Sequence, residues 1–148
     1  MSLDIYLRVE TPIEKTGSGI FIRENEQTLE ISKAEWDLKF PGKPIVIKQE
    51  PTTNYVFDYN ITHNLNGMAE AAGIYQHLWR PEELNITTAS QLIEPLKEGL
   101  TKLLDTPEFY KKYNPPNGWG NYEGLVRCVA AYLAACIKYP MAVISVSR

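Results

Sequence analysis

The amino-acid sequence predicts an α+β fold: a small, mostly antiparallel sheet that includes both chain ends, packed against three to four helices, with a β-rich hairpin insertion. Three observations lead to this prediction. Apolar residues alternate with polar ones at both ends of the chain, which is typical of half-buried strands. From Thr62 onward they recur every three or four residues, as in amphipathic helices. Between Thr11 and Thr53, strand and turn signals replace that helical spacing.

The two chain ends are expected to be neighbouring strands. Residues 3–9 alternate between apolar and polar side chains, and within residues 142–148 Ile144 and Val146 face the same way. Two short apolar strands at opposite ends of a chain are stable when they pair in one sheet. We therefore expect both termini to be held in the same sheet.

Residues 10–55 are interpreted as a β-rich insertion or arm within a single domain that spans residues 1–148. A polar turn at residues 24–27 separates two short apolar segments, which favours a hairpin. Residues 41–44 carry a strong Pro-Gly turn signal, and residues 45–48 and 55–58 suit further strands. The remainder, residues 56–148, is expected to form a helical core that ends in the last strand.

The helical part divides at its capping residues. A first helix is expected from Thr62 to Trp79, ended by the Arg80-Pro81 step. Residues 88–91 match a capping box for a second helix, in which Pro95 predicts a kink or a late start. A short helix should begin at Pro107.

The last helix follows residue 121 and is apolar nearly all round, so we expect it to be the central buried helix. It carries Cys128 and Cys136. Eight helical residues separate them by about 12 Å, too far for a disulfide bond. Both are expected to be buried free thiols.

The composition excludes some classes of function. The formal net charge of −3 disfavours a binder of nucleic acid polymers, which usually carries a clustered basic face. The longest apolar run, at residues 128–137, is too short to span a membrane, and the first residues lack a secretory signal. We therefore expect no membrane partner, and a possible homo-oligomer stays open.

No motif supports a catalytic, metal or cofactor assignment, and none is predicted. His63 and His77 are the only histidines, and about 21 Å of helix would separate them, so they cannot share a metal ion. The polar run at residues 60–64, which includes His63 and Asn64, suits either a general base or helix capping.

Two aromatic segments carry the candidate binding site. Trp79 beside Arg80 suits stacking on a nucleobase with a nearby phosphate, or simple packing at the edge of the core. In the loop at residues 114–121, glycines flank Trp119 and a helix N-terminus follows, which favours an anion cradle. The alternative is that Trp119 covers the core and Asn121 caps the helix. The candidate ligand-binding residues are His63, Asn64, Trp79, Arg80, Asn117, Trp119 and Tyr122.

Several sequence blocks resemble a family of small proteins encoded by tailed bacteriophages and prophages. The blocks read MSLDIYL, NITHNLNGMAEAAGIYQHLWRPEE, LIEPLKEGLTKL, YNPPNGWGNYEGL and SVSR, and the resemblance covers residues 1–9 and 56–148. Residues 10–55 depart from the shorter family members and are therefore treated as an insertion. The resemblance implies a phage accessory protein in the cytoplasm of the infected bacterium, and it supplies no catalytic residues.

Three functions follow as hypotheses. The first is a non-enzymatic binding protein that sequesters a small anionic or nucleotide-type ligand, such as a host defence signal. The second is a protein-interaction module in which the inserted arm adds a strand to a copy of itself or to another protein. The third is a hydrolytic or transferase enzyme that uses His63.

Overall fold

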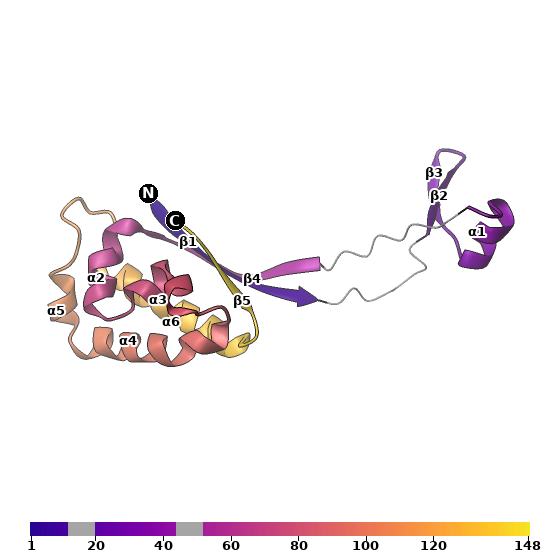
Figure 1. Ribbon diagram of the computed structural model, residues 1–148. Helices are drawn as coiled ribbons and strands as arrows, with labels where there is room; N and C mark the ends of the chain where they lie inside the picture. Colours follow the sequence, from indigo (N-terminus) through magenta and orange to yellow (C-terminus); the bar gives the residue numbers. More distant parts are fainter. Residues whose placement is uncertain (12–19, 44–51) are drawn as a thin grey trace. The chain divides into compact units, whose positions relative to one another are not determined.

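The computed structural model describes residues 1–11, 20–43 and 52–148, which fall into two compact units. Met1–Val9 and Thr53–Arg148 form the first, which we call the core unit (Figure 1). Glu10–Thr52 form the second, which we call the inserted unit.

A three-stranded antiparallel sheet organises the core unit and includes both ends of the chain. Its strands are β1 (Ser2–Thr11), β4 (Thr52–Thr62) and β5 (Val143–Ser147), in the order β4-β1-β5. The register places Leu7 opposite Ile144. Every second residue of β1 faces the helices, and Leu3, Ile5 and Leu7 are fully buried there. The predicted α+β class and the predicted pairing of the two termini are therefore confirmed.

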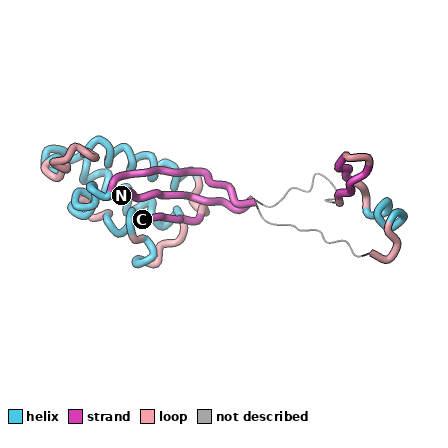
Figure 2. Tube along the Cα trace, turned by 90° about the horizontal axis from the view of Figure 1, so that it is seen from above, coloured by secondary structure: helices cyan, strands magenta, loops and turns pink. Residues whose placement is uncertain are grey.

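Helices cover one face of this sheet (Figures 1 and 2). The core of the unit lies between the two layers and contains only apolar and aromatic side chains among the buried residues described. The α-helices of the core unit are α2 (Asn66–Ala71), α3 (Tyr75–Trp79), α4 (Ile93–Asp105), α5 (Pro107–Lys111) and α6 (Tyr122–Lys138). Single 3-10 turns at His63–Leu65, Pro81–Leu84 and Ala89–Leu92 connect them.

The first expected helix is broken in the structure, so that prediction was wrong in its length. Instead of one helix up to Trp79, α2 ends at Ala71 and α3 starts at Tyr75. Gly73 between them has a φ of 78°, a left-handed conformation that a glycine adopts without a steric penalty. The apolar spacing is continuous across the break because both short helices face the same core.

The second helix begins where the capping box predicts. Thr88 and Gln91 form the reciprocal cap, and α4 follows from Ile93 after one 3-10 turn. Pro95 therefore lies in the first turn of α4, where a backbone N–H would have no partner within the helix. The late start predicted from this proline is confirmed.

Helix α6 is the longest helix described and supplies the largest number of buried residues. Cys128 and Cys136 are buried free thiols, and burial raises the pKa of each to about 12. The helix is not buried all round, which corrects the expectation from its composition. Ala130 and Ala134 are exposed, and Ile137 keeps 55% of its surface accessible. Small alanines are tolerated on a solvent face, so an all-apolar helix need not be enclosed.

In the inserted unit, β2 (Phe21–Glu24) and β3 (Gln27–Glu30) form the expected hairpin. Its turn residues Asn25 and Glu26 both have positive φ values, as a type I′ turn requires. The purely β-rich expectation was incomplete, because helix α1 (Lys33–Lys39) follows. The signal for α1 was present in Ser32, a common N-cap residue, whose side chain accepts a hydrogen bond from the backbone N–H of Glu35 at 3.2 Å. The strand expected at residues 45–48 lies outside the described residues.

Candidate functional site

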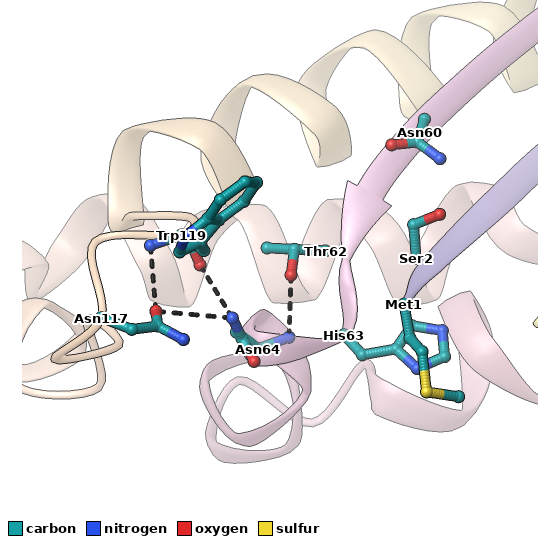
Figure 3. A pocket seen from close by; sticks show the side chains of 8 residues that line it. All are labelled: Met1, Ser2, Asn60, Thr62, His63, Asn64, Asn117 and Trp119. Carbon is teal, nitrogen blue, oxygen red and sulfur yellow. Dashed lines mark hydrogen bonds between the residues drawn. The ribbon is translucent and has the colours of Figure 1, made fainter.

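A hollow of about 670 Å³ opens where β1 begins and β4 ends, next to the loop that precedes α6. We call it the Trp119 hollow. In Figure 3, Trp119 and Asn117 lie on one side of it and Met1 and Ser2 on the other. The residues that line it are Met1, Ser2, Asn60, Thr62, His63, Asn64, Asn117 and Trp119.

Hydrogen bonds hold the loop that carries Trp119. The side-chain oxygen of Asn117 accepts from the backbone N–H of Trp119 at 3.0 Å. The side-chain amide of Asn64 donates to the Trp119 carbonyl at 3.3 Å and to the Asn117 side chain at 3.5 Å (Figure 3). The indole itself is 71% exposed. The structure therefore presents an accessible aromatic ring on a backbone that is fixed at both ends.

The two glycines that flank Trp119 have different roles. Gly120 has a φ of 95°, and a Cβ atom there would lie 2.6 Å from Cγ2 of Thr62 and 3.1 Å from Cγ of Leu65. Gly118 also has a positive φ, but a Cβ atom there would meet no atom within 4 Å. The close approach that Gly120 permits is thus to the side chains of Thr62 and Leu65 and not to a ligand, which refines the sequence interpretation.

His63 lines this hollow and also contacts a side chain of the core. Its imidazole contacts the indole of Trp79 edge-on, with ring centroids 6.3 Å apart. Its Nε2 atom is buried and has no hydrogen-bond partner among the described residues. Thr62 caps the turn by accepting from the backbone N–H of Asn64 at 3.3 Å. The capping interpretation of this polar run therefore has direct geometric support.

Two of the predicted site residues point away from the hollow. Trp79 is only 3% exposed and stacks on Tyr75 with ring centroids 5.5 Å apart, so it is a core residue. Arg80 directs its guanidinium to the Tyr75 hydroxyl at 3.5 Å and to Glu83 at 3.4 Å. Neither residue lines the Trp119 hollow, because the short helix α3 turns them to the core and to the Pro81–Leu84 turn.

The anion cradle expected at the start of α6 is occupied by the protein's own side chains. Asn121 accepts from the N–H of Gly124 at 2.7 Å, and Asn114 accepts from the N–H of Tyr122 at 2.8 Å. Tyr122 is buried, and its hydroxyl donates to the Leu103 carbonyl at 2.6 Å. Backbone donors that are already paired offer little to an anion. The capping alternative for Asn121 is confirmed, and Tyr122 is a core residue.

The lining combines amides, hydroxyl groups, one imidazole and one indole, and it contains no charged side chain. Asn60 donates to Asp4 at 2.7 Å, which leaves its carbonyl oxygen as an acceptor. The sequence reasoning did not find Met1 and Ser2, because only the pairing of β1 with β4 places them beside Asn60 and Thr62. Their own sequence carries no signal for a site.

Among the described residues, no group of three or more His, Cys, Asp or Glu side chains is arranged to hold a metal ion. Within the same residues, no helix is both long and apolar enough to cross a membrane. Comparison with protein-family models, with curated proteins and with solved structures found no match to this chain. The geometry of the Trp119 hollow is therefore the basis from which a function can be inferred.

Proposed function

We propose that the Trp119 hollow of this protein binds a small nucleotide-type ligand by the ligand's flat, hydrogen-bonding base. The protein acts by sequestering this ligand and does not transform it. The observation that carries the proposal is the 71% exposed indole of Trp119 on a loop that Asn64 and Asn117 hold in place. Because the backbone that carries this ring is already held, less of the loop has to be ordered when the ring stacks on a base, which favours affinity.

Amide groups next to the indole supply the complementary hydrogen bonds. The side-chain NH₂ of Asn117 and the side-chain oxygen of Asn64 take part in none of the hydrogen bonds found among the described residues. Between them the two amides leave one donor and one acceptor, the two kinds of group that pair with the edge of a nucleobase such as adenine. The hollow therefore offers stacking and edge recognition side by side.

The charge of the site bears on which part of a nucleotide it recognises. Arg80, which sequence reasoning placed beside the ligand, is engaged with Tyr75 and Glu83 instead. The lining side chains are uncharged, and the amides at the start of α6 are capped. These features support recognition of the base more than of a phosphate group. We infer a ligand of nucleoside or nucleotide type that is held by its ring.

The proposed biological setting comes from the resemblance to phage proteins. In an infected bacterium, a protein that binds such a ligand without consuming it lowers the concentration of free signal in proportion to its own abundance. The accessory role that we propose is the sequestration of a host defence signal with a nucleobase.

The first experiment identifies what the protein carries. The full chain is purified, denatured and analysed by mass spectrometry, and the released molecules are compared with those from the Trp119→Ala variant. We expect a base-containing compound from the native sequence only. Release of the same compounds by both proteins would contradict the proposal.

The second experiment measures binding of adenosine and AMP by calorimetry. We expect similar affinities for the two, because no charged side chain lines the hollow. Trp119→Ala should weaken both by about 5- to 150-fold, since stacking on one aromatic ring contributes roughly 1–3 kcal/mol. Phe109→Ala, an exposed aromatic outside the hollow, is the control and should change nothing. No binding of either compound at millimolar concentration, or a strong preference for AMP, would overturn base recognition.

The inserted unit supports a second candidate function, protein interaction. Leu38 on α1 is 83% exposed and Phe21 on β2 is 60% exposed, so the inserted unit presents large apolar side chains on its surface. The described strands β2 and β3 have four residues each, so they offer only short edges for strand addition. Contact through these apolar side chains is the mode that the structure favours.

This second candidate is tested by sedimentation of the full chain and of Leu38→Glu. We expect self-association of the native sequence that Leu38→Glu weakens. Leu104→Glu, at another exposed leucine, which lies in the core unit, should leave it unchanged. A native chain that stays monomeric at high concentration would rule out pairing with a second copy.

A further inference from the structure

A second hollow, of about 360 Å³, lies along the neighbouring strands β1 and β4 and is distinct from the Trp119 hollow. We call it the tyrosine hollow. Its lining residues are Tyr6, Tyr55, Val56, Phe57 and Asp58. Aromatic rings and one carboxylate make up this lining, apart from a single valine. None of these residues has a part in the function proposed above.

Two aromatic walls of the hollow meet at an angle. The rings of Tyr6 and Tyr55 have centroids 5.7 Å apart, and their planes cross at 64°. Tyr55 is 64% exposed, so its ring is accessible from solvent. This is an edge-to-face contact. The face of an aromatic ring carries partial negative charge, which attracts a cation placed over it.

The neighbouring wall is anchored to the core. Phe57 stacks on the buried Tyr132 with centroids 5.5 Å apart and planes only 9° from parallel. On the same strand, Tyr59 stacks on Phe57 at 6.2 Å. Because Phe57 already packs on these two rings, its wall of the hollow does not have to be ordered when a ligand binds.

The carboxylate of Asp58 adds a negative charge to this aromatic surface. Asp58 is exposed and takes part in none of the ion pairs found among the described residues. Arg8, on β1 two residues beyond Tyr6, forms no ion pair with it in that set either. The charge of Asp58 is therefore available to a ligand.

We propose that the tyrosine hollow binds an organic cation, either an alkylated ammonium or a guanidinium group. Aromatic faces with an adjacent carboxylate recognise such groups through cation–π attraction and direct charge pairing. The same chemistry occurs in free small cations and in methylated lysine or arginine side chains, and the experiment separates these two sources.

The test uses choline and its neutral isostere 3,3-dimethylbutan-1-ol, titrated into the full chain while the tyrosine ring signals are followed by NMR. Choline should shift the signals of Tyr6 and Tyr55 and reach saturation. The isostere, which has the same shape without the charge, should bind about 2- to 30-fold more weakly, the range expected for cation–π attraction. Equal binding of the two compounds, or no shift at these tyrosines, would overturn the proposal.

Matched variants locate the site. Asp58→Asn should weaken choline binding about fivefold at low salt, and this difference should shrink at 1 M salt because the charge pair is screened. Asp105→Asn makes the same charge change on α4 and should have no effect. Tyr55→Leu should weaken choline binding. Tyr113→Leu, which changes another exposed tyrosine, should leave choline binding unchanged. Pocket variants that bind as well as their controls would contradict the assignment.

A final comparison identifies the source of the cation. A capped tripeptide with a central trimethyllysine is titrated in the same way as choline. Tighter binding of the peptide assigns the hollow to a modified side chain of a protein, and tighter binding of choline assigns it to a small free cation. The variants and the NMR signals used in these experiments do not involve Trp119. This proposal can therefore fail while the function proposed for the Trp119 hollow stands.

Discussion

Two tyrosines of the core unit are buried alike but differ in what their hydroxyl groups contact. The Tyr122 hydroxyl donates to the Leu103 carbonyl at 2.6 Å. The Tyr132 hydroxyl is buried without a hydrogen-bond partner among the described residues. Burial also raises the pKa of Tyr132 well above its usual value, so this hydroxyl stays neutral. An unpaired buried hydroxyl costs stability, whereas a paired one contributes to it.

Replacing each of these tyrosines by phenylalanine should therefore have opposite effects. Tyr132→Phe should leave the free energy of unfolding unchanged or raise it by up to about 1 kcal/mol, because an unpaired polar group is removed. Tyr122→Phe should lower it by about 1 kcal/mol. Urea denaturation followed by circular dichroism measures both. Equal losses for the two variants would show that the Tyr132 hydroxyl is paired after all.

The glycines beside Trp119 make a second matched pair. Gly118→Ala and Gly120→Ala both place a side chain at a positive φ, which costs about 1–2 kcal/mol. Only Gly120→Ala also drives a methyl group against Thr62, so its loss should be greater by at least about 1 kcal/mol. It should also detach the loop and change the fluorescence of Trp119. Equal melting temperatures for the two variants would contradict the contact.

At the scale of the element, the start of α6 depends on side-chain caps from two asparagines. Asn121 and Asn114 satisfy two of the N–H groups that the first turn of a helix leaves unpaired. Because α6 supplies much of the buried surface, its first turn is coupled to the stability of the whole core unit. The candidate binding loop ends at the same residues, so the caps also position Trp119.

Removing the cap should therefore weaken both fold and site. Asn121→Ala should lower the free energy of unfolding by about 1 kcal/mol, the usual contribution of an N-cap. Asn66→Ala, at an exposed asparagine without a side-chain hydrogen bond in the described set, serves as the control. Chemical denaturation gives both values. A loss that is the same for the two variants would argue against a specific role for the cap.

The strand β5 provides a second prediction at this scale. It pairs with β1 along its whole length, and Arg148 beyond it donates to the Trp79 carbonyl at 2.7 Å and pairs with Glu82. Deleting residues 143–148 should destabilise the core unit by several kcal/mol, because Ile144 and Val146 lose apolar contacts with the core. An unchanged melting temperature would contradict this.

At the scale of the molecule, the inserted unit connects β1 to β4, two strands that are neighbours in an antiparallel sheet. A short turn is the usual connection between such strands. In this chain, residues 12–51 stand between these two strands in the place of a short turn. The core unit also contains all the residues of both hollows.

Replacing residues 12–51 by an Asn-Gly turn should therefore leave the core unit folded, with its Trp119 hollow intact. We expect a cooperative thermal transition and unchanged NMR signals for residues around Trp119. Any self-association of the full chain should weaken, since the exposed Leu38 and Phe21 are removed. An unfolded deletion product would show that the inserted unit is part of the core.

The sequence by itself determined the features that depend on local spacing and capping. Alternation identified both terminal strands, helical periodicity identified the apolar faces, and capping residues marked the start of α4 and α6. It was less reliable where one residue overrides a pattern, as Gly73 does, or where two signals compete, as in the missed helix α1. The sequence likewise did not predict that Ala130 and Ala134 on α6 are exposed, because composition does not indicate which side of a helix packs against other elements.

Only the tertiary structure decided which side chains meet. For Trp79 beside Arg80, the sequence allowed either stacking on a ligand or packing at the edge of the core. The packing of α3 places the indole in the core and leaves the guanidinium near Glu83. Trp119 looked equally able to cover the core, yet its loop holds it in solvent. The partners of a site residue come from distant parts of the chain, and their approach depends on how whole elements pack. A short stretch of sequence therefore does not indicate which distant residues its side chains will contact.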